Sequence, residues 1–423
     1  MSTQQRKKNI TFLLSYSSIF CLGAWRNSIE LWVKRGYAVN LIQFKDENFN
    51  SVKSQLEENY NLIQIHYPFL VKSILYLMKY LFRSLKKIGL HKISTIGDGI
   101  DYLFKSLYFV FFALVKLRKV ESEIFIGGDP PSLFAAFLIA KRKKKKLIFW
   151  ELELLIEKEL PNFGERLFKR IEKKCCRDII CAIEFGEKRS ELLRQENNIS
   201  SQTPIFSIPN SRLGTPKLER NYYFNEKFNI PKVKKIVLFA GGIITDMKEI
   251  GPLWESFQTW TDEFVLVFHS RIKNNFIHKI NIPEEILKSE RFFFHDEPMS
   301  FDAINQIYAS CDVGLILSRI NGKLNSNLYY SEWSLGKLFH YFFVGVPVIS
   351  RKLFGYDDLI EKNGVGHCFR TAKDIKYLLL KINENESFYK NNCMAISNGY
   401  AFEKYHSNII DFIKSNKLPE NLK

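Results

Sequence analysis

The chain alternates between short apolar segments and longer segments with helical spacing along almost its whole length. A β-rich segment at residues 10–14 is followed by a helix-like segment at 23–34 and by a second strand-like segment at 37–44. Parallel strands need a crossover of a dozen or more residues, usually a helix, so this spacing is typical of a parallel sheet. We therefore predict an α/β fold.

The same alternation occurs in both halves of the chain. At 423 residues the chain exceeds ordinary single-domain size, which agrees with two domains of about 200 residues each. Strands are expected at residues 10–14, 37–44, 62–66, 123–127, 146–150, 179–184, 205–208, 235–240, 264–269, 292–295, 313–317 and 347–349.

The two sets of strands are separated by a polar stretch that contains three prolines and has no sustained period. We predict two tandem Rossmann-like, doubly wound domains at 1–210 and 235–399, with a linker at 211–234. A C-terminal helix at 400–423 is expected to cross back to the first domain. Two such domains leave an interdomain cleft at the carboxyl ends of their sheets, where doubly wound folds bind ligands.

The charge is uneven. The net charge is +17, and residues 1–210 carry 34 Lys and Arg against 21 Asp and Glu, which leaves +4 for the rest of the chain. No zinc-finger spacing, basic zipper or RNA-binding aromatic signature accompanies the basic residues, so we predict no nucleic-acid partner. Anionic lipid headgroups are the better candidate.

One helix-like segment, at 69–87, gathers basic residues on one face. A basic face beside a wide apolar face suits a membrane surface, although a packed helix with a solvated face accounts for the same pattern. We predict an anionic membrane surface as a partner of these side chains: Lys72, Lys79, Arg83, Lys86 and Lys87.

The cysteine pattern and the apolar segments indicate a cytoplasmic protein. The seven cysteines are odd in number and lack metal-ligand spacing, which is typical of reduced thiols. The longest apolar run, at 107–115, is too short to cross a bilayer, and the apolar run at the start is better explained as a strand than as a signal peptide. We expect a protein located peripherally at the inner membrane face.

Two places in the second half could bind a phosphate. Gly241 and Gly242 follow a strand and precede a helical pattern that contains Lys248, so backbone and ammonium could approach an anion, although a tight turn beside a surface lysine accounts for this equally.

The second place is the start of a helix. Ser334 is a plausible N-cap, Gly336 admits close contact, and Lys337 adds charge to the positive end of the helix dipole. The alternative is a capped core helix with a solvated lysine.

Three motifs in the second half carry a family resemblance. "IYASCDVGLIL", "SLGKLFHYFFVGVPVIS" and "DDLIEKNGVGHCF" resemble the carboxyl domain of nucleotide-sugar glycosyltransferases with the two-domain GT-B architecture, in particular the family 4-like group. Upstream, "LIFWELELL" and "IPNSRLG" are similar to the end of the amino domain of that family. The resemblance covers most of the chain from about residue 123.

The resemblance implies roles for individual residues. The expected donor-binding residues are Gly241, Gly242, Lys248, Arg271, Ser334, Gly336 and Lys337. Many relatives carry two glutamates eight positions apart near this helix. Glu332 matches the first, whereas His340 stands in the place of the second, so ribose binding by a carboxylate at that place is in doubt.

Three charged residues of the first half lie near expected strand ends. Arg26, Asp129 and Glu153 could border the cleft and contact an acceptor, although helix capping or a solvated charge accounts for each of them. Asp129, Glu153 and Glu332 are the candidate catalytic carboxylates. His269 and His295 also follow strands, but no metal-ligand spacing accompanies them, so we predict no metal.

The resemblance implies a metal-independent hexosyltransferase-type enzyme that moves a sugar from a nucleoside diphosphate-sugar to a glycan or lipid-linked acceptor in cell-surface polysaccharide or lipopolysaccharide synthesis. It also implies retention of the sugar's configuration, and no cofactor besides the donor substrate. Two alternatives stay open: a nucleotide-sugar epimerase on the same fold, and a non-catalytic partner of a polysaccharide-synthesis complex.

Overall fold

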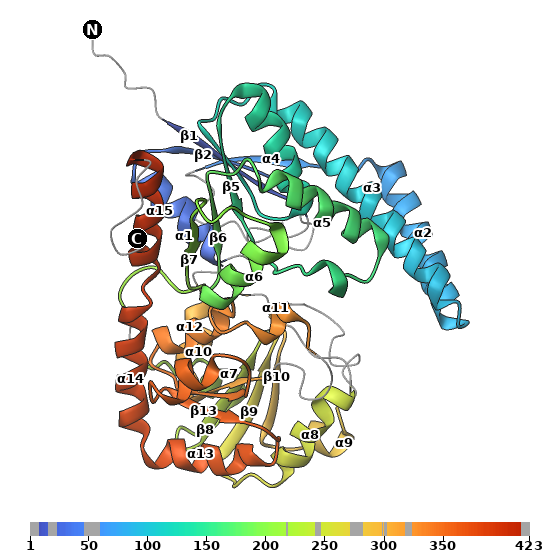
Figure 1. Cartoon of the computed structure of the whole chain (residues 1–423). Coiled ribbons are helices and arrows are strands. Elements are labelled where there is room, and N and C mark those ends of the chain that lie inside the picture. The colour runs from blue at the N-terminus through green and yellow to red at the C-terminus, as the bar shows by residue number, and fades with distance from the viewer. Residues whose placement is uncertain are drawn as a thin grey trace. The chain divides into compact units, whose positions relative to one another are not determined.

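The chain divides into two compact units (Figure 1). The computed structural model describes residues 8–15, 23–45, 60–216, 219–241, 247–270, 282–297, 299, 303–317 and 324–415. The first unit comprises Met1–Ile208 with Tyr405–Lys423, and the second comprises Pro209–Lys404.

A parallel sheet forms the centre of the first unit. Its strand order is β3-β2-β1-β4-β5-β6-β7 over the described residues. The central strands are buried along almost their whole length, as expected where helices cover both faces of a parallel sheet. The strands are β1 (Asn9–Leu14), β2 (Ala38–Phe44), β3 (Asn61–Ile65), β4 (Ile124–Gly127), β5 (Lys146–Trp150), β6 (Cys181–Glu184) and β7 (Ile205–Ser207).

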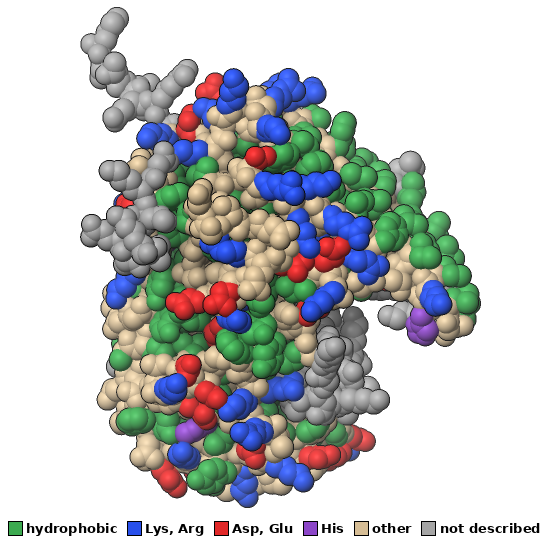
Figure 2. Space-filling view, viewed as in Figure 1, with side chains coloured by type: hydrophobic (Ala, Val, Ile, Leu, Met, Phe, Trp, Pro, Cys, Tyr) green, Lys and Arg blue, Asp and Glu red, His purple; other side chains and the backbone are tan. Residues whose placement is uncertain are grey.

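The helices of this unit include a long pair, α2 and α3, which carries hydrophobic side chains at the surface (Figure 2). Among the described helices, none combines the length and the apolar character that a membrane crossing requires. The helices are α1 (Gly23–Lys34), α2 (Phe69–Lys87), α3 (His91–Leu117), α4 (Pro130–Lys143), α5 (Phe163–Cys175), α6 (Glu187–Asn197) and α15 (Phe402–Ser415), with a 3₁₀ turn at Glu157–Glu159.

The second unit has its own parallel sheet, with the order β10-β9-β8-β11-β12-β13 over the described residues. One buried cluster packs on each of its faces, one built on α12 and the other on α8 and α13. The strands are β8 (Lys235–Ala240), β9 (Phe264–His269), β10 (Phe292–His295), β11 (Val313–Ile316), β12 (Val348–Arg351) and β13 (Gly366–Phe369).

Short helices surround this second sheet. They are α7 (Tyr223–Phe228), α8 (Met247–Gln258), α9 (Glu284–Leu287), α10 (Ile304–Ala309), α11 (Ser326–Tyr329), α12 (Gly336–Phe343), a π-helical turn at Asp357–Glu361, α13 (Asp374–Glu384) and α14 (Glu386–Gly399).

The predicted α/β class with two doubly wound parallel sheets is confirmed. Two local features differ from the sequence expectation. The stretch predicted as a linker contains α7, whose Phe224 is fully buried in the core of the second unit. The strand β13 has no counterpart in the prediction, because its four residues include a glycine and a histidine and lack an apolar run.

The order of the strands reverses at one point in each sheet. The first strand of each unit, β1 or β8, has the next two strands on one side and the later strands on the other. Such switch points open a crevice beyond the carboxyl ends of the strands. The candidate site of the second unit therefore lies near the residue that follows β8.

Candidate functional site

Gly241 directly follows the last residue of β8, at the switch point of the second sheet. Its backbone φ is +139°, a region that favours glycine, and its N–H donates to the carbonyl oxygen of His269 at the end of β9. The carboxyl end of β8 is therefore followed by a position without a side chain.

The helix α12 begins beside this point. Leu335, and not Ser334, is its N-cap residue, and no side chain of the described residues caps its first amides. The expectation that Ser334 caps the helix is wrong, because its hydroxyl lies within 3.4 Å of the carbonyl oxygen of Ser331 and donates there. Within the described residues, the positive end of the helix dipole is thus without a side-chain acceptor.

Asn210 holds the turn before α12 in place. Its amide Nδ2 donates to the carbonyl oxygen of Ser334 at 2.9 Å, and its backbone N–H donates to the carbonyl oxygen of Trp333 at 2.8 Å. A Cβ atom on Gly336 would stand 3.0 Å from Nδ2 of Asn210. The close contact that Gly336 permits within the chain is therefore with Asn210.

Lys337 brings a positive charge to the end of β8. Its side chain is half-buried and its Nζ lies 5.3 Å from the centre of the Phe239 ring and beside Gly241. No carboxylate forms an ion pair with it within the described part of the chain. Burial lowers the pKa of Lys337 to about 8, because the ammonium has lost water without gaining an anion. An anionic ligand would replace that lost solvation.

The other predicted donor-binding residues lie wholly or partly outside the described residues. Gly242 and Arg271 are outside them. The backbone of Lys248 belongs to α8, but its side chain is outside them. Their roles at the phosphate stay predictions.

Glu332 and His340 are both buried in the second unit. A Cβ atom on Gly355 would stand 2.9 Å from Cγ of Glu332, so the loop after β12 packs against this carboxylate side chain. The His340 ring stacks on Tyr308, with centroids 4.9 Å apart, and its Nδ1 lies 3.3 Å from a guanidinium nitrogen of Arg212. His340 thus has packing partners of its own where a second glutamate was expected.

Two histidines meet at the carboxyl ends of β9 and β10. Nδ1 of His269 lies 2.8 Å from Nδ1 of His295, and Nε2 of His295 is 2.9 Å from the Tyr223 hydroxyl. Both rings are buried, and burial lowers the pKa of His295. The two rings share one hydrogen bond. This bond supports the end of β9, where the carbonyl oxygen of His269 accepts from the Gly241 N–H.

Asp129 caps α4 at the switch point of the first sheet. Its carboxylate accepts from the Ser15 backbone N–H at 2.7 Å and from the Ser132 N–H at 2.9 Å, and the residue is fully buried. Burial raises the pKa of Asp129, and these hydrogen bonds oppose the rise. The observed contacts are those of a helix cap.

Of the other two first-unit candidates, Arg26 is buried on α1 and Glu153 is exposed after β5. The sequence analysis missed the neighbouring acid, Glu151, which directly follows the last residue of β5 and is only 1% exposed. Neither carboxylate oxygen of Glu151 has a hydrogen-bond partner within the described part of the chain. Its position directly after an apolar, strand-like run was the signal in the sequence.

Glu151 belongs to a buried charged cluster at the carboxyl ends of β5 and β6. Lys169 pairs with Glu172 at 2.5 Å, and Arg189 pairs with Glu184 at 2.9 Å. These two cations balance two of the three carboxylates. Burial, reinforced by the negative charge of Glu172, raises the pKa of Glu151 well above its usual range. Both effects favour the protonated form of the Glu151 carboxyl group.

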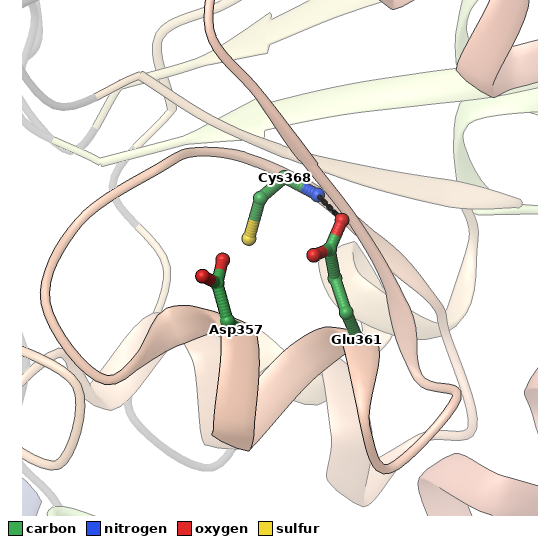
Figure 3. A group of neighbouring side chains, drawn as sticks. All are labelled: Asp357, Glu361 and Cys368. Atoms are coloured by element: carbon green, nitrogen blue, oxygen red, sulfur yellow. Dashed lines mark hydrogen bonds between the residues drawn. The ribbon is translucent and has the colours of Figure 1, made fainter.

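One group of described side chains has the donor atoms to bind a metal ion: Asp357, Glu361 and Cys368 (Figure 3). Asp357 is already paired with Lys352 at 2.7 Å, and Glu361 accepts from the Cys368 N–H at 3.1 Å. Burial and the nearby carboxylates raise the pKa of the Cys368 thiol to about 12. The contacts observed among these side chains are thus an ion pair and a hydrogen bond to the backbone.

The basic residues predicted to face a membrane lie on α2, as expected. Lys72 and Lys87 are exposed at its two ends. The side chains of Lys79, Arg83 and Lys86 lie outside the described residues.

No protein-family model matches the sequence, and a search of curated proteins finds no relative. The structure, in contrast, is similar to many solved proteins. Sucrose-phosphate synthase from Thermosynechococcus elongatus has a TM-score of 0.67 at 13% identity, over 97% of this chain and 99% of that one. Anabaena HepE in complex with UDP-glucose has a TM-score of 0.65 at 11% identity, over 96% of this chain and 99% of that one. The chain has the GT-B fold.

The GT-B fold is not confined to one activity among these neighbours. A Listeria monocytogenes protein assigned as a UDP-N-acetylglucosamine 2-epimerase has a TM-score of 0.61 at 13% identity, over 98% of each chain. Identities this low establish the fold of the chain and leave the reaction to be argued from its own residues.

Proposed function

We propose that the protein is a glycosyltransferase that uses a nucleoside diphosphate-sugar as donor. The observation that carries the proposal is the position of Lys337: an ammonium group at the carboxyl end of β8, beside Gly241 and on the first turn of a helix without a side-chain cap. Backbone amides and a lysine converging on one point form a phosphate site. Anabaena HepE, which shares the fold, binds UDP-glucose.

The chemistry follows from the charge that develops on the leaving group. As the bond between the sugar and the diphosphate breaks, negative charge grows on the diphosphate. Fixed amides and a nearby ammonium group stabilise that charge without reorganising, and so lower the barrier. In this proposal Lys337 and the first amides of α12 supply the stabilisation, and Lys248 and Arg271 add to it. We assign the neutralisation to these groups and not to a metal ion.

The acceptor and the stereochemistry belong to the same proposal. We infer a glycan or lipid-linked acceptor in cell-surface polysaccharide or lipopolysaccharide synthesis, and retention of configuration, from the motif resemblance to family 4-like enzymes. Nuclear magnetic resonance of the product, made with a defined donor, distinguishes retention from inversion.

A ligand screen tests the donor proposal. Nucleoside diphosphates and their sugar derivatives are added one at a time, with and without EDTA, and the melting temperature is measured. We expect one nucleotide to raise it in a concentration-dependent way, since a ligand that binds only the folded state stabilises that state. If none does so at millimolar concentration, and calorimetry detects no binding, the donor proposal fails and the alternative of a non-catalytic partner is favoured.

Glu151 favours a second candidate, a nucleotide-sugar epimerase. A buried carboxyl group with a raised pKa is suited to act as a general acid, and epimerisation needs acid and base groups. Incubation with the bound nucleotide sugar in deuterium oxide separates the two reactions. A transferase moves the sugar to an added acceptor, or slowly to water, and releases the nucleoside diphosphate, whereas an epimerase returns a nucleotide sugar of changed configuration that carries deuterium.

A further inference from the structure

The helices α2 and α3 form a hairpin that exposes apolar side chains to solvent. The two helices pack closely, since a Cβ atom on Gly97 of α3 would stand 2.2 Å from the Phe82 ring of α2. A second glycine of α3, Gly99, allows the same close approach to Phe163 at the start of α5. The inner face of α3 is thus fixed against the first unit, and its outer face is free of these contacts.

The outer face of α3 carries a continuous apolar stripe. Its members recur every three or four residues along the 27-residue helix, a spacing that places them on one side. The helix is about 40 Å long at 1.5 Å per residue. All seven side chains are at least 41% exposed: Ile93, Ile96, Ile100, Phe104, Leu107, Phe111 and Val115.

The helix α2 extends this apolar surface. Its exposed hydrophobic side chains include Phe69 at 85% and Leu77 at 67%, and two of them are tyrosines, Tyr76 and Tyr80. The turn between the helices adds Ile88 and Leu90. Figure 2 shows hydrophobic side chains gathered over this hairpin. A water-facing surface of this extent is typical of an interaction site.

The charge around the stripe identifies its partner. Residues 69–119 contain ten Lys and Arg and only two Asp, a net charge of +8, which is about half of the charge of the whole chain. One of the two acids, Asp101, is paired with Lys105 at 2.5 Å. Exposed lysines lie near both ends of the hairpin, among them Lys72, Lys92 and Lys116. An apolar stripe bordered by basic residues fits a bilayer with anionic headgroups.

We propose that the α2–α3 hairpin binds the surface of an anionic bilayer. The stripe side chains insert among the headgroups, the tyrosines lie at the interface, and the lysines contact lipid phosphates. The hairpin then lies on the bilayer without spanning it. The proposal goes beyond the donor site, and no nucleotide is needed to test it, so its outcome is independent of the proposed transferase activity.

Sedimentation with vesicles tests the proposal on the full chain. Phosphatidylcholine vesicles are compared with vesicles that also contain phosphatidylglycerol, at 50 mM and 500 mM salt. We expect binding to the anionic vesicles only, and weaker binding at the higher salt, because the Debye length shortens from over 10 Å to a few Å.

Two triple variants separate the apolar and charged contributions. Phe104→Gln, Leu107→Gln and Phe111→Gln remove half-exposed apolar groups and should weaken vesicle binding about 100-fold. Lys72→Gln, Lys87→Gln and Lys92→Gln should weaken it by a similar factor and reduce the salt dependence.

The matched control changes exposed apolar residues elsewhere. Val233→Gln, Tyr377→Gln and Phe388→Gln alter side chains that are 82%, 66% and 58% exposed in the second unit, and binding should not change.

The stripe variant is the triple change at Phe104, Leu107 and Phe111. If it binds anionic vesicles as strongly as the parent does, the proposal is overturned. Equal binding of the parent to neutral vesicles overturns it too. A parent dimer that the stripe variant converts to a monomer, without vesicle binding by either, assigns the stripe to contact between copies.

Discussion

The ammonium nitrogen of Lys337 lies against Gly241, since a Cβ atom built on Gly241 would stand 3.2 Å from Nζ and 3.9 Å from Cε. The two residues are 96 positions apart in the sequence. They meet because β8 ends at the switch point of its sheet and α12 begins there. A residue without a side chain and a residue with a positive charge thus define one anion site.

Replacement of Lys337 by methionine should weaken nucleoside diphosphate binding. A charge-assisted contact contributes about 1.5 to 3 kcal/mol, which corresponds to roughly a 10- to 100-fold loss of affinity. Without ligand, the variant should melt at a higher temperature than the parent, because it no longer holds a poorly solvated ammonium group. Titration calorimetry and a melting curve measure the two opposite effects.

The pH dependence sharpens this test. The pKa of Lys337 is about 8, so the parent loses the ammonium charge, and with it affinity, as the pH rises from 7 to 9. The affinity of the methionine variant should vary less over that range. Lys288→Met, on the exposed lysine that directly follows α9, is the control and should leave affinity unchanged. Parent-like affinity in Lys337→Met would remove Lys337 from the phosphate site.

The strands were predictable because burial on both faces gives them a continuous apolar run. The predicted strands at 146–150, 235–240 and 264–269 coincide with β5, β8 and β9. The edge strand β13 has no such run. Its Gly366 has a φ of +150°, and a Cβ atom there would stand 1.9 Å from the carbonyl oxygen of Val348, a constraint that comes from the neighbouring strand.

The functional residues were predictable only where the signal was local. Lys337 follows Gly336 at the start of a helix, a pattern that is visible in the sequence. The burial of Glu151 depends on Lys169 and Arg189, which come 18 and 38 residues later on two other elements. The stripe on α3 was missed for a related reason: apolar spacing does not show whether another element covers that face.

Replacement of Glu151 by glutamine should change how stability depends on pH. The folded-state pKa of Glu151 lies well above its ordinary value. The contribution of this group to the free energy of unfolding is therefore complete below about pH 4.5. That contribution is lost as the pH rises through the folded-state pKa. Glutamine does not titrate. Relative to the parent, the free energy of unfolding of the variant should therefore rise by up to about 1.4 kcal/mol per pH unit above 4.5.

Urea unfolding at pH 5, 6, 7 and 8 measures this difference. Glu153→Gln, two residues away and exposed, is the matched control and should show the same pH profile as the parent. A constant difference between Glu151→Gln and the parent across these pH values would mean that Glu151 is ionised in the folded protein.

The histidine that joins the C-terminal helix to the first unit should make the fold sensitive to acid. His406 on α15 is buried, and its Nε2 lies 2.7 Å from the Ser28 hydroxyl on α1. Burial, with a smaller effect of the Arg35 charge, lowers the pKa of His406 to about 3. The unfolded chain takes up a proton near pH 6.5 and the folded chain does not, so stability is full above that pH and falls as the pH falls toward 3.

Between pH 7 and pH 5 the parent should therefore lose about 2 kcal/mol of unfolding free energy more than His406→Gln. At pH 7 the variant itself should be less stable, because it lacks the contact with Ser28. His91→Gln, at an exposed position of α3, is the control and should follow the parent. Hydrogen exchange locates the effect: after correction for the slower intrinsic exchange in acid, the amides of α15 should be less protected in the parent at pH 5 than at pH 7, with a smaller change in His406→Gln. If the parent and the variant lose stability equally between the two pH values, His406 titrates normally and does not set the acid limit.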